Sequence, residues 1–322
     1  MKQNIEKISL LKQEIAKVIV GQEQLIERLI LALICQSHVL IEGIPGLAKT
    51  LTVNSLAQAL GLSFSRVQFT PDLLPADLTG TTIYQPQTGE FSTQKGPIFA
   101  NIVLADEINR SPAKVQSALL EAMQERQVSI GGKINRLPKP FLVLATQNPV
   151  EQEGTYPLPE AQVDRFMFKL KVEYPKFNEE LEVMRRMSKG TKPATINPVL
   201  SEADVAELTQ AINNIYIAPN LEEYILHIIS ATRSPQDYQL EIDDLIRFGA
   251  SPRASINLAM AARAKAALHG RDHVLPEDIR SLAPDVLRHR LALSYKAEAR
   301  KINSDQIIEQ ILAQVSIPEF QA

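Results

Sequence analysis

Two short segments of the chain place cationic, hydroxyl and acidic side chains directly after apolar runs. The first follows the apolar residues 39–41 and precedes a helical pattern over residues 49–60. It consists of Gly43, Ile44, Pro45, Gly46, Leu47, Ala48, Lys49 and Thr50. Backbone N–H groups in such a turn, together with the start of a helix, favour a bound anion. In this arrangement Lys49 reaches the β and γ phosphates of a nucleotide and the Thr50 hydroxyl binds Mg²⁺, so the segment predicts a phosphate-binding loop.

One residue of this loop departs from the strict pattern, because Ala48 stands where the pattern has glycine. A methyl group is tolerated at that position if the backbone φ angle is negative at the start of the helix. The departure therefore bears on the affinity for the nucleotide more than on binding itself. The alternative, a chance glycine and lysine turn, stays open without a second motif.

The second segment supplies that motif, since the apolar run 102–105 ends in Asp106 and Glu107. In nucleotide hydrolysis two such carboxylates divide the work. Asp106 would hold the Mg²⁺ shell, and Glu107 would polarise and deprotonate the attacking water. A solvated acidic strand end is the alternative, and the upstream loop makes it the weaker one.

With both motifs in order, the sequence resembles the AAA+ ATPases and, within them, the MoxR family. The resemblance covers nearly the whole chain, and the MoxR loop itself carries alanine at the position of Ala48. It implies that Val20, Gly21 and Gln22 wrap the adenine of ATP. It also implies that Asn148, in the segment 145–149 that closes a strand, helps to position the lytic water. An Asn-Pro turn is the alternative role of this residue, and both can hold together.

The resemblance further implies that Arg165 is an arginine finger, which acts on the nucleotide of a neighbouring subunit. Such an arginine neutralises the charge that develops on the γ-phosphoryl oxygens. A local ion pair between Asp164 and Arg165 is the alternative. Arg110 and Arg126 are rival candidates for the trans-acting residue.

In the C-terminal half, Ser251 and Pro252 predict the start of a helix, with Ser251 as its N-cap. Arg253 then lies in the first turn, where a positive charge opposes the helix dipole. The resemblance implies that Arg253 is the sensor 2 residue, which reaches the γ-phosphate from the lid. A nearby carboxylate partner is the alternative.

The pattern of elements predicts an α/β fold, a P-loop core with a central parallel sheet, followed by an all-helical lid. We expect strands at residues 38–42, 64–69, 102–106, 141–146 and 167–172, and hairpins at residues 81–95 and 127–137. The Gly and Pro residues in the segment 189–198 indicate a linker. The predicted domains are therefore residues 1–190 and 191–322.

Composition narrows the class of partner. The 322 residues carry a formal net charge of −3, which disfavours a protein whose main role is to coat nucleic acid. They include a single cysteine, which cannot form an internal disulfide. Residues 1–19 lack a signal-peptide pattern and no apolar run is long enough to insert into a membrane, so we expect a cytoplasmic protein.

These features predict an ATPase that uses ATP and Mg²⁺ to remodel protein partners. The resemblance implies a homo-oligomeric ring, with a hexamer favoured, and a protein client with a von Willebrand factor A domain. Two alternatives stay open: a motor like magnesium chelatase or a helicase, and an ATP-sensing scaffold with little hydrolysis.

Overall fold

The computed structural model describes residues 2–43, 46–148, 155–188 and 194–318. The chain folds into two compact units. The sheet unit comprises residues 6–158 and 170–206, and the helical unit comprises residues 1–5, 159–169 and 207–322. Part of the predicted linker, residues 189–193, lies outside the described residues. The domain boundary near residue 190 therefore stays a prediction.

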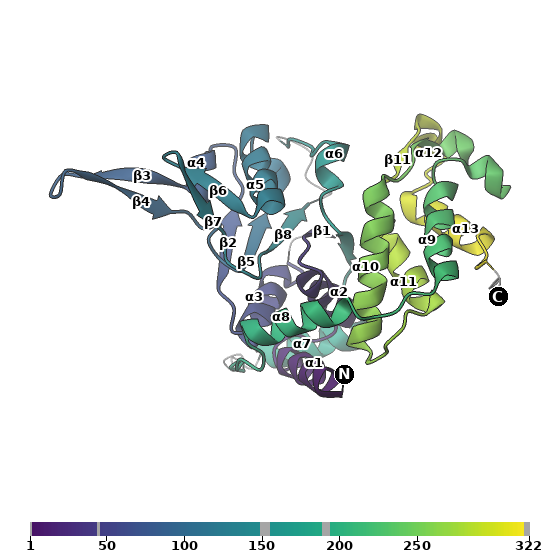
Figure 1. Cartoon of the computed structure of the whole chain (residues 1–322), viewed down its shortest axis with the longest axis horizontal. Helices are drawn as coiled ribbons and strands as arrows, with labels where there is room; N and C mark the ends of the chain where they lie inside the picture. Colours follow the sequence, from purple (N-terminus) through teal and green to yellow (C-terminus); the bar gives the residue numbers. More distant parts are fainter. Residues whose placement is uncertain (1, 44–45, 149–154, 189–193, 319–322) are drawn as a thin grey trace. The chain divides into compact units, whose positions relative to one another are not determined.

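A parallel sheet of five strands forms the centre of the sheet unit, in the order β2-β5-β8-β1-β9 (Figure 1). All five predicted strands are confirmed, and their ends agree with the prediction to within one residue. The strands are β1 (Val39–Gly43), β2 (Phe64–Gln68), β5 (Ile102–Asp106), β8 (Leu142–Gln147) and β9 (Phe168–Val172). The central strands β1, β5 and β8 are apolar and almost fully buried, as strands covered on both faces must be.

Helices follow several of these strands, as right-handed parallel connections require. The helices of the sheet unit are α1 (Lys2–Ala16), which begins in residues assigned to the helical unit, α2 (Glu23–Ile34), α3 (Lys49–Ala59), α4 (Pro75–Thr79), the 3-10 turn η1 (Ile108–Arg110), α5 (Ala113–Glu125) and α7 (Phe177–Ser188). Helix α8 (Glu202–Ile212) crosses the division in the sequence. Helix α3 confirms the helix predicted after the loop.

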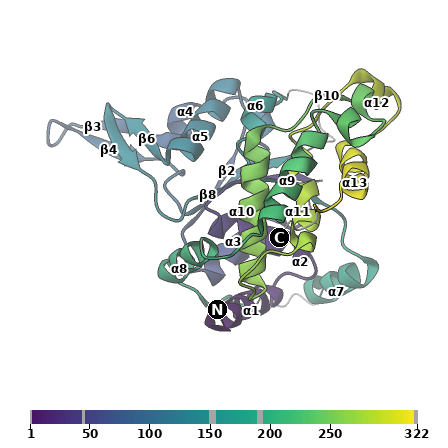
Figure 2. The ribbon, with the colours of Figure 1, turned by 45° about the vertical axis from the view of Figure 1, so that its right-hand side comes forward.

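Both predicted hairpins are present in the sheet unit. Strands β3 (Gly80–Gln85) and β4 (Glu90–Lys95) form the longer one, and β6 (Gln127–Ile130) and β7 (Lys133–Arg136) form the shorter one. The β3–β4 hairpin extends away from the sheet in both views (Figures 1 and 2). The two hairpins meet closely, because a Cβ atom on Gly131 would lie 2.5 Å from Cγ2 of Thr82.

Helices dominate the helical unit, as predicted. They are α6 (Glu160–Val163), α9 (Pro219–Ala231), the 3-10 turns η2 (Pro235–Tyr238) and η3 (Asp243–Leu245), α10 (Pro252–Leu268), α11 (Pro276–Leu287), α12 (Tyr295–Ala299) and α13 (Ser304–Gln314). Helix α10 packs against α9 and α11 (Figure 2). A short antiparallel pair, β10 (Ile246–Phe248) with β11 (Ala292–Leu293), adds a β element that the sequence analysis did not predict. Two or three paired residues are too few for a strand pattern to stand out.

None of the helices in the described ranges has both the length and the apolar character that crossing a membrane requires.

A buried histidine joins three elements of the sheet unit. His38 precedes β1, and its Nδ1 accepts the N–H of Val143 in β8 at 3.0 Å. Its Nε2 therefore carries the proton and donates to the carbonyl of Met123 in α5 at 3.1 Å. Burial lowers the pKa of His38 from 6.5 to about 4. The folded protein consequently holds this ring neutral.

This histidine predicts a loss of stability in mild acid. Between pH 6.5 and pH 4 the unfolded chain takes up a proton at His38 that the folded chain excludes, so stability falls as the pH drops. At pH 5 the contribution amounts to about 2 kcal/mol. Urea unfolding at pH 7 and pH 5 measures it. We expect the loss to be smaller by about that amount in His38→Gln, and an unchanged loss would contradict the assignment.

Candidate functional site

A cavity of about 420 Å³ opens in the sheet unit where β1, β5 and β8 end. Ligands of parallel α/β sheets commonly bind outside these carboxyl ends. Most of the predicted phosphate and metal residues meet here. The lining consists of Gly43, Gly46, Leu47, Ala48, Lys49, Thr50, Leu51, Arg66, Gln68, Asp106, Glu107, Thr146 and Asn148. Ile44 and Pro45, which were also predicted to bind phosphate, lie outside the described residues.

Lys49 begins helix α3, and its ammonium group turns back over the loop. Its Nζ donates to the carbonyl of Gly43 at 2.7 Å. Burial lowers the pKa of Lys49, while the charges of Asp106 and Glu107 oppose that shift. The cation therefore lies in the field of both carboxylates, which keeps it charged in a partly desolvated place.

The condition of a negative φ at Ala48 is not met. Ala48 is the N-cap of α3 and has φ +54° and ψ 20°, in the left-handed region. The bend from β1 into α3 needs this conformation, which is why the strict pattern has glycine at the position. For an alanine the left-handed conformation costs roughly 1–2 kcal/mol. The loop therefore carries strain that the sequence analysis did not anticipate.

Gln22 supports this loop through its side-chain amide. Its Nε2 donates to the carbonyl of Leu47 at 3.0 Å, and its Oε1 accepts from the hydroxyl of Thr52 at 3.2 Å. Val20, Gly21 and Gln22 do not line the cavity in the described part of the chain. Their predicted contact with adenine stays a prediction.

Thr146 links the Asp106 carboxylate to the backbone of Glu107, and the sequence analysis missed it. Its hydroxyl donates to Asp106 Oδ1 at 2.6 Å and accepts the backbone N–H of Glu107 at 2.8 Å. It is 2% exposed, on the strand next to β5. Glu107 has φ +57°, also in the left-handed region. Thr146 therefore stabilises the strained backbone turn at Glu107 and orients the Asp106 carboxylate at the same time.

Strand β2 contributes two further contacts that the sequence analysis missed. Arg66 donates to Asp106 Oδ2 from Nε at 3.1 Å and from Nη2 at 2.6 Å. Gln68 Nε2 donates to Glu107 Oε2 at 2.7 Å, and Arg110 Nε lies 3.2 Å from the same oxygen. The alternation of Arg66 and Gln68 along one strand was the available signal. Whether these side chains reach Asp106 and Glu107 depends on the pairing of β2 with β5, which cannot be read from the sequence.

Asn148 and Thr50 complete the predicted set in the sheet unit. Asn148 is 8% exposed and follows β8, while Thr50 is half-buried in the first turn of α3. Both line the cavity together with Asp106. An amide, a hydroxyl and a carboxylate thus face one space, which is the donor set that Mg²⁺ and a water molecule require.

The rival arginines of the sheet unit both have partners. Arg126 donates to the side chain of Gln36 at 2.6 Å and to its carbonyl at 2.8 Å. Arg110 is paired with Glu107, as described above. These contacts give each arginine a structural role within its own chain.

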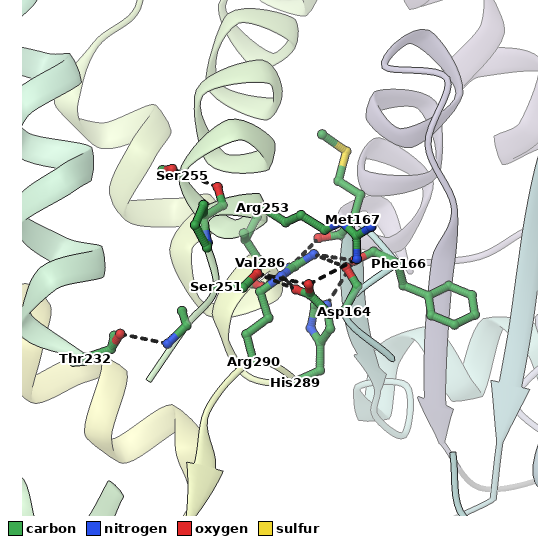
Figure 3. Close-up of polar contacts among 12 residues, drawn as sticks. Asp164, Phe166, Met167, Thr232, Ser251, Arg253, Ser255, Val286, His289 and Arg290 are labelled. Carbon is green, nitrogen blue, oxygen red and sulfur yellow. Dashed lines mark hydrogen bonds and ion pairs between the residues drawn. The ribbon is translucent and has the colours of Figure 1, made fainter. Parts of the chain in front are cut away.

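Arg165 and Arg253 belong to the helical unit. Figure 3 shows the polar contacts that Asp164 makes there. The alternative of an Asp164–Arg165 ion pair is not realised, because Asp164 pairs with Arg290 at 2.8 Å. Arg165 is half-buried, and its side chain has no hydrogen bond or ion pair with any described residue. For Arg253 the alternative holds, since its Nη1 lies 3.4 Å from Asp164 Oδ2.

Ser251 is the N-cap of α10, as predicted, and Pro252 follows at the first helical position. Its hydroxyl does not cap the helix and instead donates to the carboxylate of Asp164 at 2.9 Å.

Comparison with known proteins agrees with this arrangement. Residues 38–168 match the family described as "ATPase family associated with various cellular activities (AAA)", and residues 239–311 match the AAA lid domain. Chaperone MoxR1 of Mycobacterium tuberculosis is 50% identical over 312 residues, which span 96% of this chain and 82% of that protein. The chain belongs to the MoxR family of AAA+ ATPases.

Two further relatives support the family assignment. Protein MoxR of Methylorubrum extorquens is 32% identical over 324 residues, which span 94% of this chain and 92% of that protein. A crystal structure from Cytophaga hutchinsonii, provisionally named an ATPase, matches with a TM-score of 0.94 at 53% identity. That match covers 98% of this chain and 96% of the other. The predicted fold, an AAA core followed by a helical lid, is therefore confirmed.

The strain at Ala48 predicts that Ala48→Gly stabilises this MoxR protein. Glycine removes the left-handed penalty of roughly 1–2 kcal/mol but adds about 0.4–1 kcal/mol of freedom to the unfolded chain. Urea unfolding should show a net gain of about 0.5–1 kcal/mol. Ala57→Gly, inside the same helix, is the control and should lose about 1 kcal/mol or more. Equal losses in both variants would contradict the strain.

The position of Thr146 predicts that Thr146→Val disturbs the Asp106 carboxylate and the backbone turn at Glu107. The variant leaves the buried N–H of Glu107 without an acceptor, which costs about 1–3 kcal/mol of stability. It also removes the hydrogen bond that orients Asp106 Oδ1, so Mg²⁺ should strengthen nucleotide binding less than in the wild type. Urea unfolding and titration with a fluorescent ATP analogue measure the two effects. Thr93→Val, on the exposed side of β4, is the control. Wild-type values in Thr146→Val would contradict the assigned role.

Proposed function

We propose that this chain binds ATP with Mg²⁺ in the cavity of the sheet unit and hydrolyses it. The supporting observation is that three segments far apart in sequence line one cavity of about 420 Å³. They contribute Lys49 and Thr50, Asp106 and Glu107, and Asn148. These residue types are the ones that phosphoryl transfer to water requires. The MoxR family assignment supports the same reaction.

Each residue has a distinct part in the proposed reaction. The loop N–H groups and Lys49 hold the β and γ phosphates, and Glu107 takes a proton from the attacking water. Thr50 and Asp106 fit Mg²⁺ because they offer the oxygen ligands that it prefers. When bound, the ion neutralises charge on the phosphates. Asn148 orients the water.

The contacts that Arg66 and Gln68 make with the two carboxylates must break before this reaction. Arg66 occupies Oδ2 of Asp106, and Gln68 occupies Oε2 of Glu107. Arg66 is half-exposed, at 49%, so its release into solvent is easy. Residues of the neighbouring strand thereby hold both carboxylates until nucleotide enters.

We propose further that the subunits form a ring, with a hexamer favoured, in which Arg165 completes the site of the neighbouring subunit. The guanidinium of Arg165 has no hydrogen bond or ion pair with any described residue, and this supports the role, since a charge that acts on a neighbouring subunit must not be neutralised within its own chain. Arg253 would act as sensor 2 once it leaves Asp164.

We propose a protein as the client, remodelled in a chaperone-like way. The hairpin β3–β4 exposes three large apolar side chains, Ile83, Tyr84 and Phe91, with exposed fractions from 43% to 73%. Such a surface suits a protein more than phosphate groups, which need cations. A partner with a von Willebrand factor A domain and a cytoplasmic location are part of this proposal. Stimulation of ATP hydrolysis by DNA would instead favour the helicase-like alternative.

The ATPase proposal predicts that Glu107→Gln loses turnover and keeps nucleotide binding. Loss of the general base should lower kcat about 10²- to 10⁴-fold. Phosphate release with Mg²⁺-ATP and binding of a fluorescent analogue measure the two properties. Glu121→Gln, at an exposed position on α5, is the matched control and should behave as the wild type. If neither the wild type nor the variant turns over at any protein concentration, the chain is a nucleotide sensor and no ATPase.

A further inference from the structure

Arg290 is the most completely bonded arginine side chain in the helical unit. It follows α11, and its side chain is 1% exposed. Burial lowers its pKa to about 10, against the opposing charge of Asp164, so it stays a cation at neutral pH. A buried cation with its full set of partners is rigid, because any movement leaves a donor unsatisfied.

The five N–H donors of Arg290 each have an acceptor. Nε donates to Asp164 Oδ1 at 2.8 Å, and Nη2 donates to the carbonyls of Asp164 at 3.0 Å and Phe166 at 2.6 Å. Nη1 donates to the carbonyl of Met167 at 3.2 Å and to that of Val286. Four of these bonds reach residues 164–167 (Figure 3).

These bonds surround Arg165 without touching it. The carbonyls immediately before and after Arg165 in sequence, those of Asp164 and Phe166, both accept from Nη2 of Arg290. The neighbouring His289 adds a bond from Nε2 to the Phe166 carbonyl at 3.0 Å. The backbone on each side of Arg165 is therefore fixed, while its own side chain has no partner among the described residues.

The bonds from Arg290 to residues 164–167 are called the clamp below, and Asp164 connects this clamp to Arg253. Its carboxylate is held by Arg290 and by the Ser251 hydroxyl, and Arg253 approaches Oδ2 at 3.4 Å. Arg253 is exposed, at 51%, and has the longest of these contacts. Arg290 and Asp164 thus form a rigid ion pair, whereas Arg253 can move away from Asp164.

We propose that Arg290 is a positioning residue for Arg165: it holds the backbone on both sides so that the Arg165 guanidinium projects to the neighbouring subunit in one fixed direction. The inference rests on the proposed function, in which Arg165 acts in trans. Lysine cannot replace Arg290, because a single ammonium group cannot reach acceptors spread over residues 164–167. A displacement of about 1 Å at a catalytic group can cost about 10²-fold in rate.

A subunit-mixing experiment tests this role. Arg290→Lys should lower kcat by about 10²-fold or more, with KM for ATP little changed, because its own nucleotide site is intact. Glu107→Gln subunits cannot hydrolyse ATP but present an intact Arg165. Mixed rings of Arg290→Lys with Glu107→Gln should therefore exceed the summed activity of the two separate preparations. Mixed rings of Arg290→Lys with Arg165→Ala should not.

Controls separate positioning from folding. Arg271→Lys changes another arginine of the helical unit, which pairs with Asp278 through two bonds at 2.7 and 2.8 Å. It should keep wild-type turnover. Thermal unfolding shows whether Arg290→Lys is folded. If it is not, Asp164→Asn takes its place in the same mixing assay, since it weakens the clamp from the other side and retains an oxygen for Ser251.

The outcomes distinguish the two proposals. Wild-type turnover in folded Arg290→Lys, or a loss that Glu107→Gln subunits do not restore, overturns the positioning role. Failure of the reference mixture, Arg165→Ala with Glu107→Gln, to recover activity overturns the trans role of Arg165 and the positioning role together. An inactive wild type overturns the ATPase proposal itself.

Discussion

The parallel pairing of β5 with β8 is the constraint on which the candidate site depends. It sets Ala105 beside Ala145, so the next residues of both strands, Asp106 and Thr146, emerge side by side at the edge of the sheet. The Thr146 hydroxyl then bonds Asp106 and the backbone of Glu107. A shift of one residue in this register would turn one of the two side chains to the opposite face of the sheet. The loop after β1 reaches the same edge because β1 pairs with β8 in parallel.

Strain accompanies this arrangement at two places. Ala48 and Glu107 both have positive φ angles, at the turns that follow β1 and β5. Each lies where the chain must leave the sheet sharply and still point a functional group into the cavity. Tertiary contacts of the surrounding strands and helices hold both conformations, which isolated peptides would rarely adopt. The stability of the buried sheet thereby supports a site that is locally unfavourable.

In the helical unit, hydrogen bonds from a charged side chain hold the proposed functional group in place. A guanidinium that must act outside its own chain cannot be fixed by its own ion pairs, since these would compete with its target. Arg290 bonds the backbone around Arg165, and the side chain of Arg165, for which we propose such a role, has no partner among the residues that the structure describes. The carboxylate of Asp164 neutralises the buried Arg290, so the clamp needs no other counter-ion.

Much of the molecule was predictable from local patterns. The five strands, the two hairpins and the loop before α3 followed from apolar runs and turn residues, because these depend on neighbours in sequence. The order of residue types also predicted Lys49, Thr50, Asp106 and Glu107, and the resemblance to the MoxR family added Asn148; all five line one cavity. Tertiary structure alone decided the contacts of Arg66 and Gln68 with the two carboxylates, the contacts of Thr146 with Asp106 and the backbone of Glu107, and the pairing of Asp164 with Arg290. Each of these depends on strand order or on segments more than a hundred residues apart, and no local pattern encodes such distances.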